Sequence, residues 1–322
     1  MEFLQDLWHA LPEPLRDPVA LAVPFFVVFV LVEGFAAYLL EDERPEEARR
    51  GPDGRALPLP GGYDRGDAVA SVSMGAVSVV TMTLWKTLGL VVYSVLFAYV
   101  APWQLPMDAW WTWALAILGV DFFFYWAHRV AHRVRLVWAT HQAHHSSEYF
   151  NFATALRQKW NNSAELVFWL PLPLLGVPPA LVFFGFSVSL VYQFFVHTER
   201  VDRLWRPIEL VFNTPSHHRV HHGSDPEYLD RNYGGIVIVW DRLFGSFQPE
   251  LHRPTYGLTT PVGTNHILKL QTHEYAAIVR DVRRAPTWRD KLGYVFGPPG
   301  WRPESVAPAA SPEPAPEPAA PV

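Results

Sequence analysis

Four long apolar stretches separated by polar segments dominate the hydrophobic pattern of the chain. Three of them cover residues 19–40, 68–101 and 109–127. Each can cross the hydrocarbon core of a bilayer as a helix, for which about 20 apolar residues suffice. The fourth covers residues 166–196 and contains PLPLLGVPP at its centre. Because proline interrupts a straight helix, we expect a helical hairpin there that enters and leaves on one side. The pattern predicts an all-α integral membrane protein with about three transmembrane helices plus this hairpin.

Basic residues after two of the stretches predict the orientation, because short cytoplasmic loops are enriched in Lys and Arg. They follow the first and the third stretch at Arg44, Arg49, Arg50, Arg55, Arg129, Arg133 and Arg135. We therefore expect the N-terminus outside and the chain after residue 128 inside, apart from the hairpin. This is the topology of a multi-pass protein of a bacterial cell membrane with its active site on the cytoplasmic face. A large soluble core built from the same apolar helices is the alternative.

The composition supports the membrane interpretation and excludes several kinds of chemistry. Half of the residues are hydrophobic and 18% are charged, whereas an average soluble domain carries about 25% charged residues. A net charge of −5 makes nucleic acid an unexpected partner, because binding to phosphates needs a basic surface. The chain has no cysteine, so disulfides, iron–sulfur clusters and cysteine zinc sites are excluded. Any metal must be bound through nitrogen or oxygen.

Histidines provide the strongest chemical signal, since nine of the 14 fall in residues 128–145 and 217–222. Eight of them follow i, i+4 or i, i+3, i+4 spacing, which places imidazoles on one stripe of a helix. These eight are His128, His132, His141, His144, His145, His218, His221 and His222. Imidazole nitrogen suits Fe, Zn, Cu or Ni, and eight ligands exceed what one ion takes. The spacing therefore predicts a histidine-rich cap that holds two metal ions at the membrane surface.

Simpler readings of the same histidines remain open. HRVAH at 128–132 could be a chance pair on the surface, and it is no zincin motif because Arg129 stands where a general base would be. Clustered histidines could also form a pH sensor or a solvated basic patch. We expect a supporting role next to the ligands for Asp121, Glu148, Asn213, His217 and Asn232; for Asp121, an ordinary helix-end charge is the alternative. Four histidines lie apart from the clusters: His9, His252, His266 and His273.

These boxes resemble those of the sterol desaturase and fatty acid hydroxylase superfamily of integral-membrane di-iron enzymes. Longer strings around them look like the alkylglycerol monooxygenase branch. They are HQAHHSSEYFNFATALRQ (141–158), YQFFVHTE (192–199), NTPSHHRVHHGSDPEYLDRNYGG (213–235) and VWDRLFGSF (239–247). In that branch the histidine before Thr-Glu, here His197, belongs with the boxes, so the resemblance implies nine metal ligands. The implied site is a di-iron centre, in which zinc can displace iron on purification.

The resemblance implies a monooxygenase that uses O₂ to hydroxylate an unactivated C–H bond of a lipid, an alkylglycerol ether in this branch, with electrons from tetrahydrobiopterin. A fatty-acyl or sterol hydroxylase or desaturase fed by cytochrome b5 or ferredoxin is the alternative enzyme. A non-catalytic membrane protein with structural zinc is the alternative of another class. No fused electron carrier is visible in the sequence, since LPGG at 59–62 lacks the histidine of a cytochrome b5 motif. The electron donor must therefore be external.

Three regions follow from these patterns. Residues 1–67 contain the first span and a cytoplasmic loop, and residues 68–297 form the fatty acid hydroxylase-like catalytic domain. Residues 298–322 are rich in Pro and Ala, and we expect them to be disordered because they cannot bury enough apolar surface. Within the second region, residues 235–240 have the character of a short β-strand.

Overall fold

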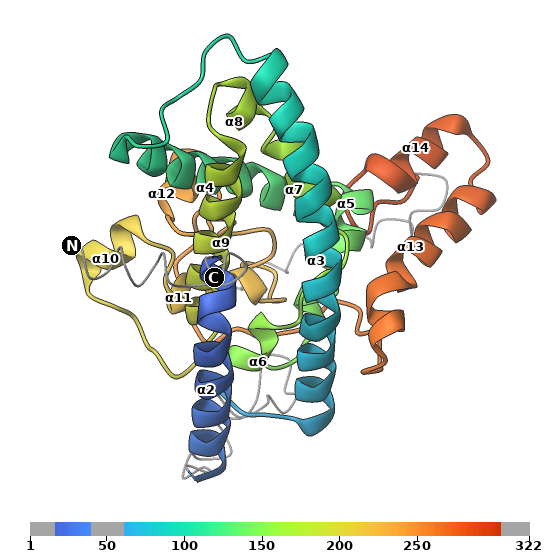
Figure 1. Cartoon of the computed structure of the whole chain (residues 1–322). Coiled ribbons are helices and arrows are strands. Elements are labelled where there is room, and N and C mark those ends of the chain that lie inside the picture. Colours follow the sequence, from blue (N-terminus) through green and yellow to red (C-terminus); the bar gives the residue numbers. More distant parts are fainter. Residues whose placement is uncertain (1–16, 40–60, 304–322) are drawn as a thin grey trace, which may run out of the picture.

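The computed structural model describes residues 17–39 and 61–303, and these residues are almost entirely helical (Figure 1). Four helices in it are long and apolar enough to cross a membrane. They are α2 (Pro18–Leu39), α3 (Arg65–Tyr99), α4 (Trp110–Arg133) and α9 (Pro179–Val196). The predicted all-α membrane architecture is confirmed. The predicted loop after the first span and the Pro/Ala-rich tail lie largely outside the described residues.

The lengths of the spanning helices show how the site is tied to the membrane. Helix α3 has 35 residues, which at about 1.5 Å per residue is longer than a hydrocarbon core of about 30 Å. Its first turn is capped by Asp64, whose side chain accepts a hydrogen bond from the backbone N–H of Asp67 at 2.8 Å. Helix α4 continues beyond the predicted apolar stretch to Arg133. This extension carries His128 and His132 on a membrane helix.

The fourth apolar stretch forms a hairpin with one broken arm, as its prolines predict. The broken arm consists of α7 (Ser163–Phe168) and α8 (Pro171–Leu174), and α9 is the returning arm. The chain reverses at Gly176, whose φ of +83° favours glycine. A Cβ there would also lie 2.6 Å from the carbonyl oxygen of Trp103. The hairpin packs on α3 and α4 through the core formed by Tyr93, Val120, Leu172, Val182 and Phe186.

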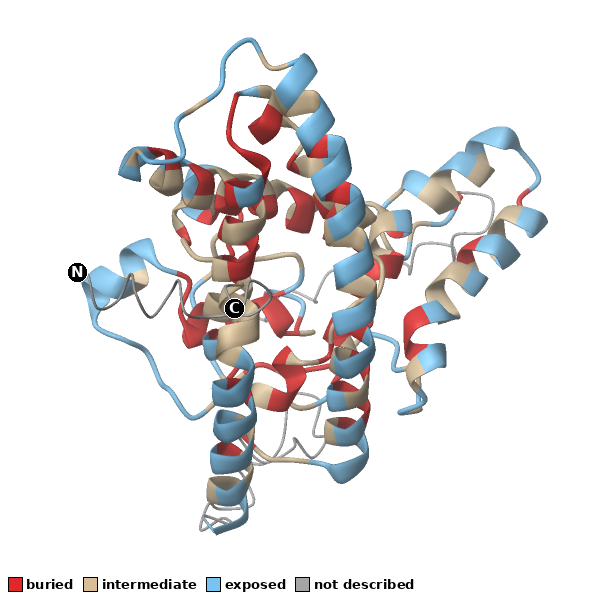
Figure 2. Cartoon of the chain, in the orientation of Figure 1, coloured by how far each residue is buried: buried red, intermediate tan, exposed pale blue. Residues whose placement is uncertain are grey.

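Shorter elements surround the end of α4 and complete the molecule. They are α5 (Arg135–His141), η3 (His144–Ser146), α6 (Phe152–Ala155), α10 (Arg206–Val211), α11 (Pro215–His222), α12 (Val239–Leu243), α13 (Ile267–Arg284) and α14 (Trp288–Phe296). Helices α13 and α14 project from the bundle (Figure 1). Buried residues concentrate where α4, α9 and α11 approach one another, and the outer faces of α2 and α3 are exposed (Figure 2). Apolar residues make up much of those outer faces, as expected of helices that face lipid.

The predicted β-strand at residues 235–240 is wrong. The described residues contain no strand here, only an isolated bridge between Phe212 and Val237, and α12 begins at Val239. The backbone N–H groups of Ile236 and Val237 donate to the carboxylate of Asp121 instead of to a neighbouring strand. A β-branched run without a partner ladder therefore remains a loop.

Candidate metal centre

The nine predicted ligands converge from four parts of the chain into two adjacent groups. Helix α4 supplies two histidines, the region from α5 to η3 supplies three, the end of α9 supplies one and α11 supplies three. The group of five contains His128, His132, His141, His145 and His221; the group of four contains His144, His197, His218 and His222. In each group, one ligand atom per residue lies within 4.8 Å of every other. Each group could hold a metal ion.

Histidines that are close neighbours in sequence belong to different groups. His218 and His222 are i, i+4 and share the group of four, whereas His221 turns to the other group. The trio at 141–145 divides in the same manner, with His144 apart from its neighbours. The expectation of one continuous helical stripe for this trio is wrong, because α5 ends at His141 and a 3₁₀ turn begins at His144. The break lets neighbouring histidines face two centres.

Imidazole nitrogens approach one another closely inside each group. The Nε2 atoms of His128 and His145 lie 2.9 and 3.0 Å from Nε2 of His141. In the group of four, Nε2 of His197 lies 3.3 Å from Nε2 of His144 and 3.0 Å from Nε2 of His218. All nine side chains are buried, each with 8% or less exposed. The nitrogens therefore point to two common centres away from water.

Backbone carbonyls determine which nitrogen of several rings faces the centre. A carbonyl can only accept a hydrogen bond, so each contacting Nδ1 carries the proton and leaves the Nε2 lone pair available. The four such pairs are His128 with Tyr233 (2.9 Å), His144 with Arg157 (3.2 Å), His197 with Gln193 (2.6 Å) and His221 with Arg231 (3.0 Å). In addition, Nδ1 of His132 lies 3.6 Å from the carboxylate of Asp230. Such partners orient metal-binding imidazoles.

The donor set fits a transition metal. Buried Nε2 atoms of His132, His221 and His222 have no hydrogen-bond partner among the described residues, and a buried polar atom without a partner is costly. Coordination by a metal ion would satisfy these lone pairs. Donors that are all imidazole suit Fe, Zn, Cu or Ni better than Mg or Ca. The residues of the two groups thus fit a transition-metal ion of this kind.

Burial also keeps these rings in the metal-binding form. Burial lowers the pKa of His197 to about 4. The hydrogen bond to the Gln193 carbonyl raises this pKa, but by less than burial lowers it. Burial and then the neighbouring imidazoles lower the pKa of His144 and His222 well below the usual value. A histidine with a pKa in this range is neutral at pH 7. Neutral imidazole is the form that binds metal.

Asp121 supports the site in a different way from the one predicted. Among the described residues its carboxylate accepts no hydrogen bond from a ligand ring; it accepts from the backbone N–H of Ile236 (2.6 Å) and the indole N–H of Trp240 (2.9 Å). Ile236 belongs to the loop that follows Tyr233, and Trp240 belongs to α12, which that loop enters. Asp121 therefore acts through that loop, whose Tyr233 carbonyl accepts from His128.

The other four predicted supporting residues also do not hydrogen bond to a ligand ring in the described residues. Asn213 donates to the Gly234 carbonyl at 2.8 Å, and Asn232 exchanges hydrogen bonds with Gln248 at 2.8 and 2.9 Å. The ring of His217 lies 3.0 Å from Glu209, and Glu148 is exposed. Three of the four are thus buried scaffold residues around α11 and the loop after it.

The sequence reasoning missed the residues that make the orienting contacts. Tyr233, Arg231, Arg157 and Gln193 contribute backbone carbonyls, which every residue type carries, so no sequence signal could reveal them. Asp241 offered a weak signal as a lone acid in an apolar run. Its carboxylate accepts from the backbone N–H groups of Tyr233 (2.8 Å) and Gly234 (2.7 Å) and so holds the loop against α12.

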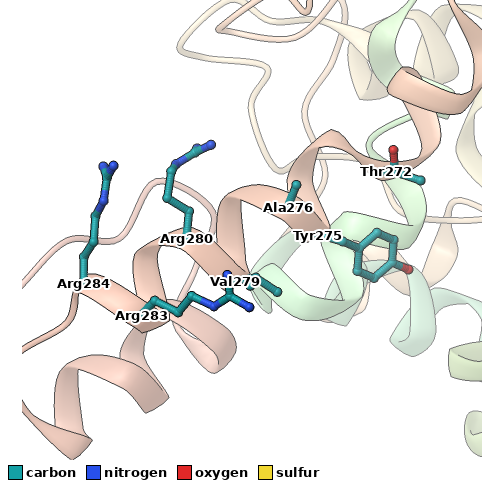
Figure 3. A pocket seen from close by; sticks show the side chains of 7 residues that line it. All are labelled: Thr272, Tyr275, Ala276, Val279, Arg280, Arg283 and Arg284. Atoms are coloured by element: carbon teal, nitrogen blue, oxygen red, sulfur yellow. The ribbon is translucent and has the colours of Figure 1, made fainter.

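Open cavities on the surface lie outside the histidine groups. One, of about 600 Å³, lies along α13, where Thr272, Ala276 and Val279 share a face with arginines (Figure 3). Another, of about 630 Å³, is lined by charged residues that include Glu199 and Arg219. These two residues lie within two positions of His197 and His218 along the chain, but no histidine of the two groups lines this cavity.

Comparisons with known proteins agree with this geometry. Residues 113–246 match the fatty acid hydroxylase family. The chain is 38% identical to human alkylglycerol monooxygenase over 90% of its own length, and 39% identical to that of Danio rerio over 88%. It spans 61% and 59% of those two proteins.

A more distant relative and the solved structures complete the comparison. The ornithine lipid hydroxylase OlsE of Rhizobium tropici is 31% identical over 46% of the chain and 44% of that protein. No solved structure matches the chain. The predicted resemblance is confirmed: residues 113–246 match the fatty acid hydroxylase family, in a chain that is similar to the alkylglycerol monooxygenases over most of its own length.

Proposed function

We propose that this protein is an O₂-dependent lipid monooxygenase with a di-iron site, and that its substrate is an alkylglycerol ether lipid. The observation that carries the proposal is the pair of buried, all-histidine groups at the end of a membrane helix. The names of the most similar relatives support the choice of substrate. His128, His132, His141, His145 and His221 would bind one iron, and His144, His197, His218 and His222 the other.

Bound iron would supply the redox chemistry with O₂ that side chains alone cannot perform. The chain itself contributes orientation and a dry environment. Nδ1 protons held by backbone carbonyls keep Nε2 lone pairs directed to the centres. Phe150 lies against the rings of His197 and His222, with ring centroids 5.5 and 5.1 Å apart, and excludes water from that side. A dry site of this kind would keep water from competing with the lipid C–H bond for the oxidant.

The electron donor distinguishes this proposal from its alternatives, and we assign tetrahydrobiopterin as the donor. Purified protein reloaded with iron should convert a synthetic alkylglycerol to an aldehyde and glycerol with only O₂ and a tetrahydropterin. The hydroxylated carbon next to the ether oxygen yields a hemiacetal, which breaks down to these products. The measurement is aldehyde release in detergent.

The same assay identifies each alternative. Aldehyde that forms only with a reductase and cytochrome b5 or ferredoxin would overturn the pterin while retaining the monooxygenase. Oxidation of a fatty-acyl or sterol substrate instead would favour the hydroxylase or desaturase alternative. Iron-loaded protein that consumes no O₂ with any lipid or donor would favour a structural zinc site.

We also propose that the site faces the cytoplasm of a bacterial cell, since basic residues follow the first and the third span. Reporter fusions after residues 60, 160 and 260 should all report the cytoplasm. The fusions at 160 and 260 follow histidine boxes that both contribute to the same two adjacent groups, so they must lie on one face. Opposite locations for these two fusions would contradict the single-site proposal.

A further inference from the structure

The α10 segment, residues 200–212, connects α9 to α11 and is exposed along almost its whole length. Every residue of it except Glu209 is exposed. Helix α10 itself buries no residue. Large apolar side chains nevertheless make up more than half of the segment: Val201, Leu204, Trp205, Ile208, Leu210, Val211 and Phe212. Contiguous apolar surface of this kind marks an interaction site in a soluble or membrane protein.

The apolar surface of the segment continues onto a membrane-spanning helix. The Arg242 guanidinium of α12 donates to the backbone carbonyl of Glu209 at 3.1 Å, which places α12 beside the segment. Phe244, directly after α12, is also exposed. Its ring centroid lies 4.9 Å from that of Trp126 in α4 and 6.4 Å from that of Phe122. The surface is therefore continuous with a helix that faces lipid.

Charge and aromatic content favour a bilayer surface over a protein as the occupant. The segment carries Arg200, Arg203 and Arg206, against which Asp202 and the half-buried Glu209 are the acids. Trp205 is 75% exposed between two of the arginines. Tryptophan with flanking arginine is the composition that anchors segments where headgroups meet acyl chains. Arginine can extend from such a position towards phosphate.

Backbone hydrogen bonds within the α10 segment lower the free-energy cost of placing it at the bilayer surface. The N–H groups of Ile208 and Phe212 donate to the carbonyls of Trp205 and Ile208 at 2.9 and 2.8 Å. The Leu204 N–H donates to the Glu209 carboxylate at 2.9 Å. A segment with satisfied backbone groups can enter the interfacial region at little cost.

We propose that the α10 segment is seated in the bilayer interface, with Trp205, Ile208 and Val211 against the acyl chains and the arginines among the headgroups. A side-chain contact connects the segment to the helix that carries three of the ligands. Glu209 lies 3.0 Å from Nε2 of His217, the residue before His218. The membrane surface therefore adjoins the group of four.

The absence of cysteine allows a direct test. Single cysteines replace Trp205, Ile208 or Val211. The variants are labelled with bimane and reconstituted in phosphatidylcholine vesicles that contain phosphatidylglycerol. Val91→Cys, exposed on α3, is the lipid reference, and Thr260→Cys, exposed on a loop, is the water reference. Retained metal content shows that each variant is folded, which is expected because the replaced side chains are exposed.

At all three positions, the quenching of bimane by lipid nitroxides should be within about twofold of that at Val91→Cys. Quenching by iodide should be at least about fivefold weaker than at Thr260→Cys. Quenching by iodide as strong as at Thr260→Cys would overturn the proposal. Protection from both quenchers would also overturn it, because a protein, such as a second copy of this chain, would then cover the segment.

Discussion

Replacing any one of the nine clustered histidines by alanine should lower turnover by about 100-fold or more. Each variant should also retain roughly one of two metal ions, because the two groups share no histidine and the other group stays complete. His132→Ala and His218→Ala test the two groups separately. The measurements are metal content per chain and lipid oxidation rate after reloading with iron.

His252→Ala and His266→Ala are the matched controls, since both residues are exposed and lie outside the two groups. They should leave turnover and metal content unchanged. Wild-type turnover in several variants of the nine would exclude the two-centre assignment. Loss of both metal ions from every variant would indicate that the groups bind metal only as one cooperative unit.

Arg157→Met should destabilise the protein by about 3–5 kcal/mol, because it leaves the buried carboxylate of Asp67 without its cation. Only 1% of Arg157 is exposed, and its Nη2 donates to Asp67 Oδ1 at 2.6 Å. The same guanidinium donates to the hydroxyls of Ser71 (3.0 Å) and Ser146 (2.8 Å). Equilibrium unfolding in detergent measures the change.

A double-mutant cycle separates the lost ion pair from lost packing. Adding Asp67→Asn to Arg157→Met removes the unpaired charge and should recover part of the stability. Arg200→Met, at an exposed position, should have little effect. Because the Arg157 carbonyl accepts from His144, the single variant should also bind less metal in the group of four. Equal stability of Arg157→Met and the unsubstituted protein would contradict a structural role for the pair.

Local sequence patterns predicted much of the fold and the ligand set. Membrane-spanning helices can be predicted from the local sequence, because crossing the hydrocarbon core requires about 20 consecutive apolar residues independently of the rest of the chain. The hairpin can be predicted because its prolines interrupt a straight helix. The i, i+4 relation of His128 and His132 depends only on helix geometry. His197 has no such spacing, and only its resemblance to a known motif indicated it.

Short-range chemistry is enough to predict the membrane helices, the hairpin and the residues able to bind metal, so these could be predicted from the amino-acid sequence. Only the tertiary structure decided how the histidines divide between two centres, because α5 ends at His141 and the chain turns before His144. It also decided which groups orient them. Those groups are backbone carbonyls at Tyr233 and Arg157, which any sequence carries and only long-range packing brings to the rings. The partners of Asp121 were likewise brought to it only by tertiary packing, because they lie more than 100 residues away along the chain.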